Sequence, residues 1–310
     1  MKSAGPERAS LAPTADTICA VVVAFFPDRE FEERLRGLLP QVGGVVVIDN
    51  TPEAGRTRNI AAPVEEGKPV RIIGNPDNVG VGAALNQGLA QALAWGFAWM
   101  LALDQDSRCR PDMTRTLSDV FAACPVKPVV IGGNYFDPRQ GRTRVPADAA
   151  GGFLEQKTVI TSGSLIDAVF AHAIGGFRED YFIDQLDHEF CLRARSHGGR
   201  VVISRKPVMS HSVGEAGGAR LPLLGRLPNH PPLRKYYIAR NSLVTIAEYW
   251  RREPDWCLRR LLRLLMGAAS MLLLETQGLA KIRAFAFGVA DALRGSMGPC
   301  RRQRLLDERG

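Results

Sequence analysis

The chain has 310 residues, 45% of them hydrophobic and 23% charged, a composition typical of soluble globular proteins that excludes collagen-like, disordered and disulfide-stabilised classes. The formal net charge of +8 is concentrated near the C-terminus, where residues 220–310 hold 17 basic and 7 acidic side chains. A basic segment of this kind attracts phosphates, anionic lipids or nucleic acids without selecting among them.

No secretion signal or transmembrane helix is expected. Residues 1–17 contain no apolar run, and the uncharged apolar stretch at residues 264–274 is too short for a segment that needs about 20 residues to cross a bilayer. The six cysteines form no C-x-x-C pair and no zinc-ligand spacing. Reduced thiols in a cytosolic protein are therefore expected.

The first half of the sequence alternates strand and helix patterns. Helices are expected from Asp28 to about residue 39 and over residues 82–95, where Gly96 is a plausible C-cap. This order predicts an α/β fold, with a mainly parallel central sheet and helices on both of its faces. The expected strands, which are β-branched and apolar, are residues 18–26, 42–48, 70–74 and 99–103.

The second half is less regular. We expect a helix over residues 165–173, a Gly- and Pro-rich lid or connection over 214–232, and a C-terminal helical region. The helices of that region are expected at 235–252, 255–275 and 279–293. The predicted organisation is a disordered tail at 1–17, an α/β domain at 18–232, C-terminal helices at 233–295 and a polar tail at 296–310.

Polar side chains gather where the predicted strands end. Asp49, Asn78 and the run Asp104-Gln105-Asp106 all follow strands, and ligands of such sheets bind beyond the carboxyl ends of the strands. Two carboxylates one residue apart suit a hard divalent cation, with His211 as a candidate third ligand. Solvated turn carboxylates and a structural histidine are the alternatives.

Three carboxylates fall within six positions at a predicted helix start, at Asp184, Asp187 and Glu189. Asp187 is suited either to capping this helix or to accepting a proton from a hydroxyl nucleophile. Glu189 and Arg193, four residues apart, are also spaced as a simple surface ion pair.

Asn78-Val79-Gly80, with Asn86 one turn into the next helix, offers amides and backbone N–H groups to a nucleotide. The first strand lacks a Gly-rich turn, which disfavours a dinucleotide-binding enzyme, and no phosphate loop, H-E-x-x-H or G-x-S-x-G motif is present. Tyr237 and Arg240 share one helix face, able either to meet a diphosphate or to pack as buried residues. Arginines flank the leucines of residues 256–274, which suits an anionic membrane surface, a core helix or a dimer contact.

These motifs occur in one order and together resemble the family 2 inverting glycosyltransferases of the GT-A fold, in particular their rhamnosyltransferase branch. The stretch over residues 229–241, N-H-x-P-L-R-K-Y-Y-x-x-R-N, is most similar to enzymes that add the second rhamnose of rhamnolipids. The resemblance spans about residues 18–293. Its motifs are Phe25-Phe26-Pro27, Asp49-Asn50, Asn78-x-Gly80 with Asn86, Leu103-Asp104-Gln105-Asp106-Ser107, Phe182-Ile183-Asp184-x-x-Asp187-x-Glu189, and His211.

The resemblance implies a dTDP-L-rhamnose donor and a divalent cation, Mg or Mn, held by Asp104, Asp106 and His211. Asp187 is the implied catalytic base, and Glu189 orients the acceptor. The nucleotide-sugar-binding residues that it implies are Phe25, Asp49, Asn78, Gly80, Asn86, Asp104, Gln105, Tyr237 and Arg240.

The implied reaction transfers rhamnose, with inversion, to a hydroxyl of a glycolipid, converting mono-rhamnolipid to di-rhamnolipid. The implied location is cytoplasmic and peripheral at the inner membrane, with no nucleic-acid partner. A transferase acting on a lipid-linked polysaccharide precursor is the nearest alternative. A non-catalytic membrane-surface or nucleic-acid-binding protein, and a nucleotide-sugar epimerase or reductase, are more distant ones.

Overall fold

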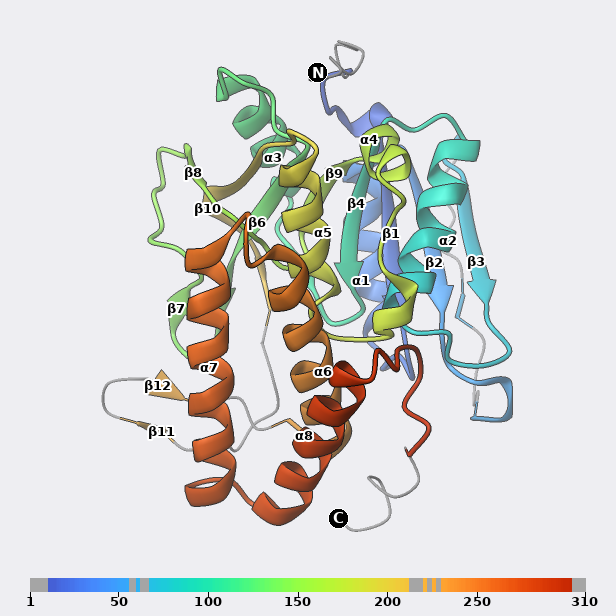
Figure 1. Cartoon of the computed structure of the whole chain (residues 1–310). Helices are drawn as coiled ribbons and strands as arrows, with labels where there is room; N and C mark the ends of the chain where they lie inside the picture. Colours follow the sequence, from blue (N-terminus) through green and yellow to red (C-terminus); the bar gives the residue numbers. More distant parts are fainter. Residues whose placement is uncertain are drawn as a thin grey trace.

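A central β-sheet determines where the functional side chains lie (Figure 1). The computed structural model describes residues 11–55, 60–61, 67–211, 220–221, 225–226 and 230–302, and the strands follow the order β3-β2-β1-β4-β9-β6-β10-β5. β1 lies between β2 and β4 and is parallel to both, and β3 is parallel to β2. These four strands confirm the predicted ones: β1 (Ile18–Ala24), β2 (Gly44–Asp49), β3 (Val70–Gly74) and β4 (Trp99–Asp104).

The other half of the sheet is mixed. β9 (Ser164–Asp167) runs antiparallel between β4 and β6 (Val130–Asp137), and β10 (Val201–Ser210) is parallel to β6. Short antiparallel strands pair with β6 and β10. They are β5 (Arg108–Cys109), β7 (Arg142–Thr143) and β8 (Phe153–Glu155), and a separate two-stranded pair is formed by β11 (Arg220–Leu221) and β12 (Gly225–Arg226).

The helix predicted over residues 165–173 is wrong in its first part. Leu165 and Ile166 belong to β9, where both are buried between β4 and β6. The helix α4 begins only after Asp167, whose side chain accepts a hydrogen bond from Phe170 N at 2.9 Å and so caps it. The apolar run was too short to show its period from sequence.

Alternate residues of β1 face opposite layers of helices, as a strand covered on both sides requires. Ile18, Ala20 and Val22 pack in the core formed with α1 and α3, whereas Cys19 and Val21 pack in the core formed with α2, α4 and α5. This is the predicted α/β arrangement. The helices are α1 (Phe31–Leu38), α2 (Val81–Ala94), α3 (Met113–Ala123), α4 (Ala168–Ala173) and α5 (Leu186–Ser196), with short 3-10 turns at Ala15–Thr17, Leu39–Gln41, Glu53–Gly55 and Glu179–Tyr181.

Three C-terminal helices pack against one another beside the sheet, as Figure 1 shows in orange and red. They confirm the helices predicted there: α6 (Pro232–Tyr249), α7 (Pro254–Leu273) and α8 (Gly278–Leu293). Among the described residues, no helix combines the length and hydropathy that a transmembrane segment requires. Most of the predicted lid over 214–232 lies outside the described residues.

Both predicted tails make contacts with the core. Residues 11–17, which we expected to be disordered, include a 3-10 turn, and Trp99 Nε1 donates to the Leu11 carbonyl at 2.6 Å. At the other end, Cys300 N donates to the Tyr237 hydroxyl at 2.7 Å. These contacts depend on the buried positions of the tryptophan and tyrosine, which the sequence of either tail does not reveal.

Candidate active site

One cavity of about 1200 Å³ lies beyond the carboxyl ends of β1 and β4. The sheet contributes Phe25, Asp104, Gln105 and Asp106, and His211 follows β10. Its opposite wall comes from α6, α7 and α8, and the start of α5 contributes residues 184–188. The structure therefore brings together acids from three distant parts of the sequence, as the position of strand ends predicted.

Asp104, Asp106 and His211 form a compact cluster. Ligand atoms of all three lie within 4.8 Å of one another; His211 Nε2 is 3.9 Å from Asp104 Oδ2, and Nδ1 is 3.5 Å from Asp106 Oδ1. His211 is 9% exposed, and its buried Nδ1 has no hydrogen-bond partner. Two carboxylates and an imidazole with an unsatisfied nitrogen fit a divalent cation, so these residues suit Mg or Mn.

The charges of this cluster favour a cation as well. Burial raises the pKa of Asp104, and the nearby positive charge of His211 only partly offsets this rise. The negative charges of Asp106 and Asp187 raise the pKa further. Burial opposes ionisation of Asp106, but contact with His211 outweighs it and lowers the pKa of that carboxyl. The pKa of His211 is raised because the three nearby acids, Asp104, Asp106 and Asp137, outweigh its burial. Such mutual repulsion among acids is relieved by a bound cation.

The turn between the two metal-facing acids is fixed by its neighbours. Gln105 Oε1 accepts from Phe25 N at 2.7 Å, and its Nε2 donates to the Phe25 carbonyl at 3.0 Å. Arg34 Nε donates to the Gln105 carbonyl at 2.8 Å. Gln105 therefore ties the end of β1 to the turn after β4 and keeps Asp104 and Asp106 facing the cavity.

Asp187 lines the same cavity from the first turn of α5. Its Oδ1 accepts from His188 N at 2.8 Å, and the positive end of the helix dipole stabilises the carboxylate there. The preceding loop is strained, because Phe182, Asp184 and Gln185 have φ angles of 65°, 63° and 68°. Strain of this kind persists only where the surroundings hold the backbone.

Helix α6 holds that loop. Asn241 Nδ2 donates to the carbonyls of Tyr181, Ile183 and Asp184 at 3.0, 2.8 and 2.9 Å. Arg240 Nη2 donates to the Asp180 and Tyr181 carbonyls at 3.2 and 3.1 Å, and its Nη1 donates to the Gly298 carbonyl at 2.6 Å. Both side chains are fully buried. Their hydrogen bonds offset the strain of the loop that carries Asp187.

Arg240 and Tyr237 instead contact the loop before α5. Neither lines the cavity, and Tyr237 is fully buried, stacked on Phe182 with ring centroids 5.4 Å apart. Their shared face points toward the loop before α5 and not toward a donor. Arg240 is a structural anchor, and the alternative interpretation of a helix with two buried tyrosines is correct.

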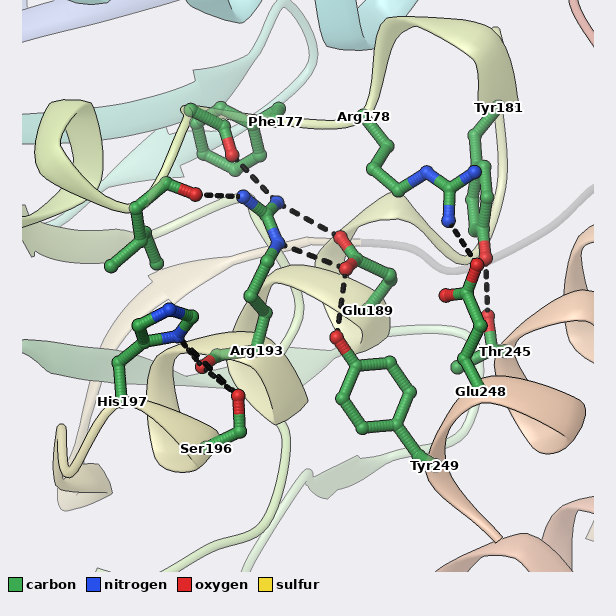
Figure 2. Close-up of polar contacts among 12 residues, drawn as sticks. Phe177, Arg178, Tyr181, Glu189, Arg193, Ser196, His197, Thr245, Glu248 and Tyr249 are labelled. Atoms are coloured by element: carbon green, nitrogen blue, oxygen red, sulfur yellow. Dashed lines mark hydrogen bonds and ion pairs between the residues drawn. The ribbon is translucent and has the colours of Figure 1, made fainter. Parts of the chain in front are cut away.

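Glu189 also points away from the cavity. Figure 2 shows it between Arg193, whose Nε and Nη2 donate to its two oxygens at 2.9 Å each, and Tyr249, whose hydroxyl donates at 3.0 Å. It is 2% exposed and does not line the cavity. In the structure its carboxylate joins Arg193 of α5 to Tyr249 of α6. The pair with Arg193 was anticipated by its spacing, but it is buried and not on the surface.

The predicted nucleotide residues have structural partners. Asn86 bridges Phe177, accepting from its N at 2.7 Å and donating to its carbonyl at 2.9 Å. Asn78 Oδ1 accepts from Gly80 N at 2.9 Å, and Gly80 has a φ of 85° in close contact with Phe182. Asp49 is buried at the end of β2 and accepts from Thr51 N at 2.9 Å. None of the four lines the described cavity.

The sequence interpretation missed most of the helical side of the cavity. Arg260, Leu264, Gly267, Met271 and Leu274 follow one another at spacings of three or four, which places them on one face of α7. That periodicity was the available signal. His188, His230, Arg234, Lys235, Arg263 and Glu275 are further polar residues of the lining.

Comparisons with known proteins identify the family of this chain. The family model "Glycosyl transferase family 2" matches residues 21–181. The dTDP-rhamnosyl transferase RfbF of Shigella flexneri is 28% identical over 242 residues, which cover 74% of this chain and 79% of that protein.

Solved structures share the fold at low sequence identity. S. aureus TarS 1-349 in complex with UDP-GlcNAc has a TM-score of 0.58 at 14% identity and covers 90% of this chain and 83% of that chain. GalNAc-T7 with UDP, GalNAc and Mn2+ has a TM-score of 0.52 at 12% identity, covering 78% and 49%. Since the family model spans more than half of the sequence, the chain belongs to glycosyl transferase family 2 and is a glycosyltransferase of the GT-A fold.

Proposed function

We propose that the protein is an inverting rhamnosyltransferase that moves L-rhamnose from dTDP-L-rhamnose to a glycolipid hydroxyl, converting mono-rhamnolipid to di-rhamnolipid. The observation that carries the proposal is the meeting of Asp104, Asp106, His211 and Asp187 in one cavity whose far wall is apolar. Similarity to a dTDP-rhamnosyl transferase supports the donor. The apolar wall supports a lipid acceptor.

Asp104, Asp106 and His211 would hold the divalent cation, Mg or Mn. When bound there, the cation supplies positive charge that neutralises the donor diphosphate as it leaves. Gln105 and Arg34 keep the two acids in place through the turn after β4. Phe25 and Asp49, at the carboxyl ends of β1 and β2, remain our candidates for contact with the nucleoside.

Asp187 acts as the general base. It accepts the proton of the acceptor hydroxyl while that oxygen attacks the anomeric carbon, and the bond from this carbon to the diphosphate oxygen breaks. The products are a rhamnoside of inverted configuration and dTDP. Asn241 and Arg240 act through the loop before α5, and they are positioning residues for this step.

Exposed leucines and arginines on the outer face of α7 support a peripheral location at the cytoplasmic face of the inner membrane. Leu262, Leu265 and Leu272 are 50%, 59% and 62% exposed, and Arg259 lies on the same helix. Such a face binds anionic bilayers through apolar burial and charge. Sedimentation with anionic vesicles, and release at high salt, tests this location.

The assay that tests the function incubates the protein with dTDP-L-rhamnose, Mn2+ and mono-rhamnolipid. We expect di-rhamnolipid by mass spectrometry, and its absence, together with transfer to a lipid-linked sugar in a parallel panel, favours the polysaccharide-precursor alternative. A UDP-sugar in place of dTDP-rhamnose is the donor control. Consumption of UDP-GlcNAc but not of dTDP-rhamnose contradicts the proposed donor.

A further inference from the structure

The cavity has two chemically different walls. The sheet side is acidic, whereas the side formed by the three C-terminal helices has a continuous apolar part, with arginines, a lysine and Glu275 beside it. We call this side the helical wall; it comprises Ile238, Leu264, Met266, Gly267, Met271 and Phe285. A nucleotide sugar is polar, so binding of the donor does not require this apolar surface.

The helical wall continues to the surface. Leu273 and Leu274 line the cavity and are nevertheless 78% and 45% exposed, and Met266 is 46% exposed. The cavity therefore opens beside exposed apolar side chains of α7. A ligand that enters here passes from an apolar rim to the acidic cluster.

Gly267 lies in the interior of α7, where glycine destabilises a helix relative to alanine. A Cβ at this position meets no heavy atom within 4 Å, so packing does not require a glycine. In contrast, a Cβ at Gly288 lies 2.3 Å from the Tyr236 carbonyl, and one at Gly88 lies 2.1 Å from Val21. The space left by Gly267 belongs to the cavity.

Two arginines of α7 lie beside the helical wall. Arg260 and Arg263 line the cavity, and among the described residues neither forms an ion pair with a carboxylate; Arg260 donates to Ser242 Oγ from Nε at 2.9 Å and Nη2 at 2.8 Å. Cations beside an apolar wall complement an amphiphile that carries an anionic group. A neutral alkyl chain alone offers no anionic group to these two arginines.

We propose that the helical wall binds an acyl chain of the acceptor, that Gly267 keeps the space for this chain open, and that Arg260 and Arg263 meet an anionic group of the same lipid. The inference rests on the proposed function, because it takes the acceptor to be a glycolipid. It adds where the lipid lies and which residue sets the length that fits.

The test uses a series of rhamnosides with hexyl, octyl, decyl and dodecyl chains as acceptors for dTDP-rhamnose. Burial of each CH₂ contributes about fourfold to affinity, so kcat/KM of the native enzyme rises with chain length. In Gly267→Phe the added ring fills the wall, and the dodecyl-over-hexyl preference falls by about tenfold or more. Gly267→Ala gives a smaller decrease, and it remains informative if the larger variant does not fold.

The matched control is Gly37→Phe, at an exposed position in α1 where a Cβ also meets nothing within 4 Å. It retains the native chain-length preference. An unchanged preference in both Gly267 variants, or an equal loss for all chain lengths, overturns the inference.

A binding experiment separates this inference from the proposed function. Displacement of the fluorescent fatty acid cis-parinaric acid by dodecyl rhamnoside, and not by hexyl rhamnoside, reports on the helical wall without any donor. If no transfer of rhamnose is found but this displacement is seen and is weakened in Gly267→Phe, the donor assignment fails and the acyl site stands. Displacement of equal strength in the native protein and Gly267→Phe contradicts the acyl site.

Discussion

The guanidinium of Arg234 forms a bidentate ion pair with the carboxylate of Asp184. Nε lies 3.1 Å from Oδ2 and Nη2 lies 2.6 Å from Oδ1, so the first turn of α6 is tied to the strained loop before α5. Both residues line the cavity, and Asp184 precedes Asp187 by three positions in the sequence. The pair fixes the backbone from which the proposed base projects.

Arg234→Met is expected to lower kcat about tenfold, because Asp184 then keeps its charge in the cavity without its partner and its left-handed backbone loses an anchor. The measurement is steady-state kinetics with dTDP-rhamnose, and thermal unfolding accompanies it. Arg234→Lys, which keeps the charge but not the planar fork, recovers part of the loss. An unchanged kcat in Arg234→Met contradicts a positioning role.

Asp187→Asn is expected to lower turnover by about 100-fold or more while the affinity for dTDP stays within about twofold, because only the proton acceptor is removed. Calorimetric titration with dTDP and product formation by mass spectrometry measure the two quantities. The base assignment does not survive if the variant turns over at the native rate.

Glu189→Gln serves as the matched contrast, two residues further along the same helix. It removes the charge that pairs with Arg193 and weakens the contact with Tyr249, so we expect unfolding in urea to require about 3 kcal/mol less free energy. Turnover per folded molecule stays near the native value. A large loss of turnover without destabilisation restores the acceptor-orienting role.

Removal of divalent cations with EDTA is expected to abolish transfer, and Mn2+ or Mg2+ restores it. Asp106→Asn is expected to lower the affinity for Mn2+ by about 100-fold, because losing even a residue that only supports a metal ligand lowers metal affinity 10- to 100-fold. The check is the Mn2+ concentration that gives half-maximal rate. Full activity in EDTA refutes the metal-binding role of the cluster.

Glu275 makes the C-terminal helices sensitive to acid. Burial by itself raises its pKa, but hydrogen bonds from Lys235 and Lys281 outweigh burial and lower the pKa below the ordinary 4.5. At Lys235 burial outweighs the same pairing and lowers the pKa of that ammonium.

Since folded Glu275 binds its proton more weakly than the unfolded chain does, its contribution is complete above about pH 4.5 and is lost as the pH falls through the lowered folded value. Thermal unfolding from pH 7 to pH 3 measures this loss. Glu275→Gln is expected to be less stable at pH 7 and to lose less on acidification. Parallel pH profiles for the two proteins contradict the prediction.

Local sequence signals predicted the sheet edge well. Strands β1, β2 and β4 are apolar runs, and polar residues such as Asp49 and Asp104 come where the run stops. Because the carboxyl ends of parallel strands meet at one edge of a sheet, Asp49 and Asp104 lie at the same edge. The acidic cluster likewise indicated a helix start, and α5 begins at Leu186 within that cluster.

Side-chain direction could not be predicted in the same way. The spacing of Tyr237 and Arg240 shows that they share a helix face, but only the packing of α6 on the loop over residues 180–184 shows what that face contacts. The family resemblance implied that Glu189 orients the acceptor as a neighbour of Asp187, yet positions two apart on a helix point in different directions. Glycine at 267 has meaning only once the cavity beside it is known.

The hydrogen bonds from Asn241 to the main chain before α5 bear on how relatives of this protein are recombined. A chimaera joined ahead of α6, to exchange acceptor preference, brings a foreign helix against the backbone that aims the base. A crossover placed after Tyr249, where α6 ends, keeps the hydrogen bonds from Asn241 and exchanges α7, α8 and the segment that follows them. We therefore expect chimaeras joined after Tyr249 to keep turnover while their acceptor preference changes. Chimaeras joined ahead of α6 are expected to lose turnover.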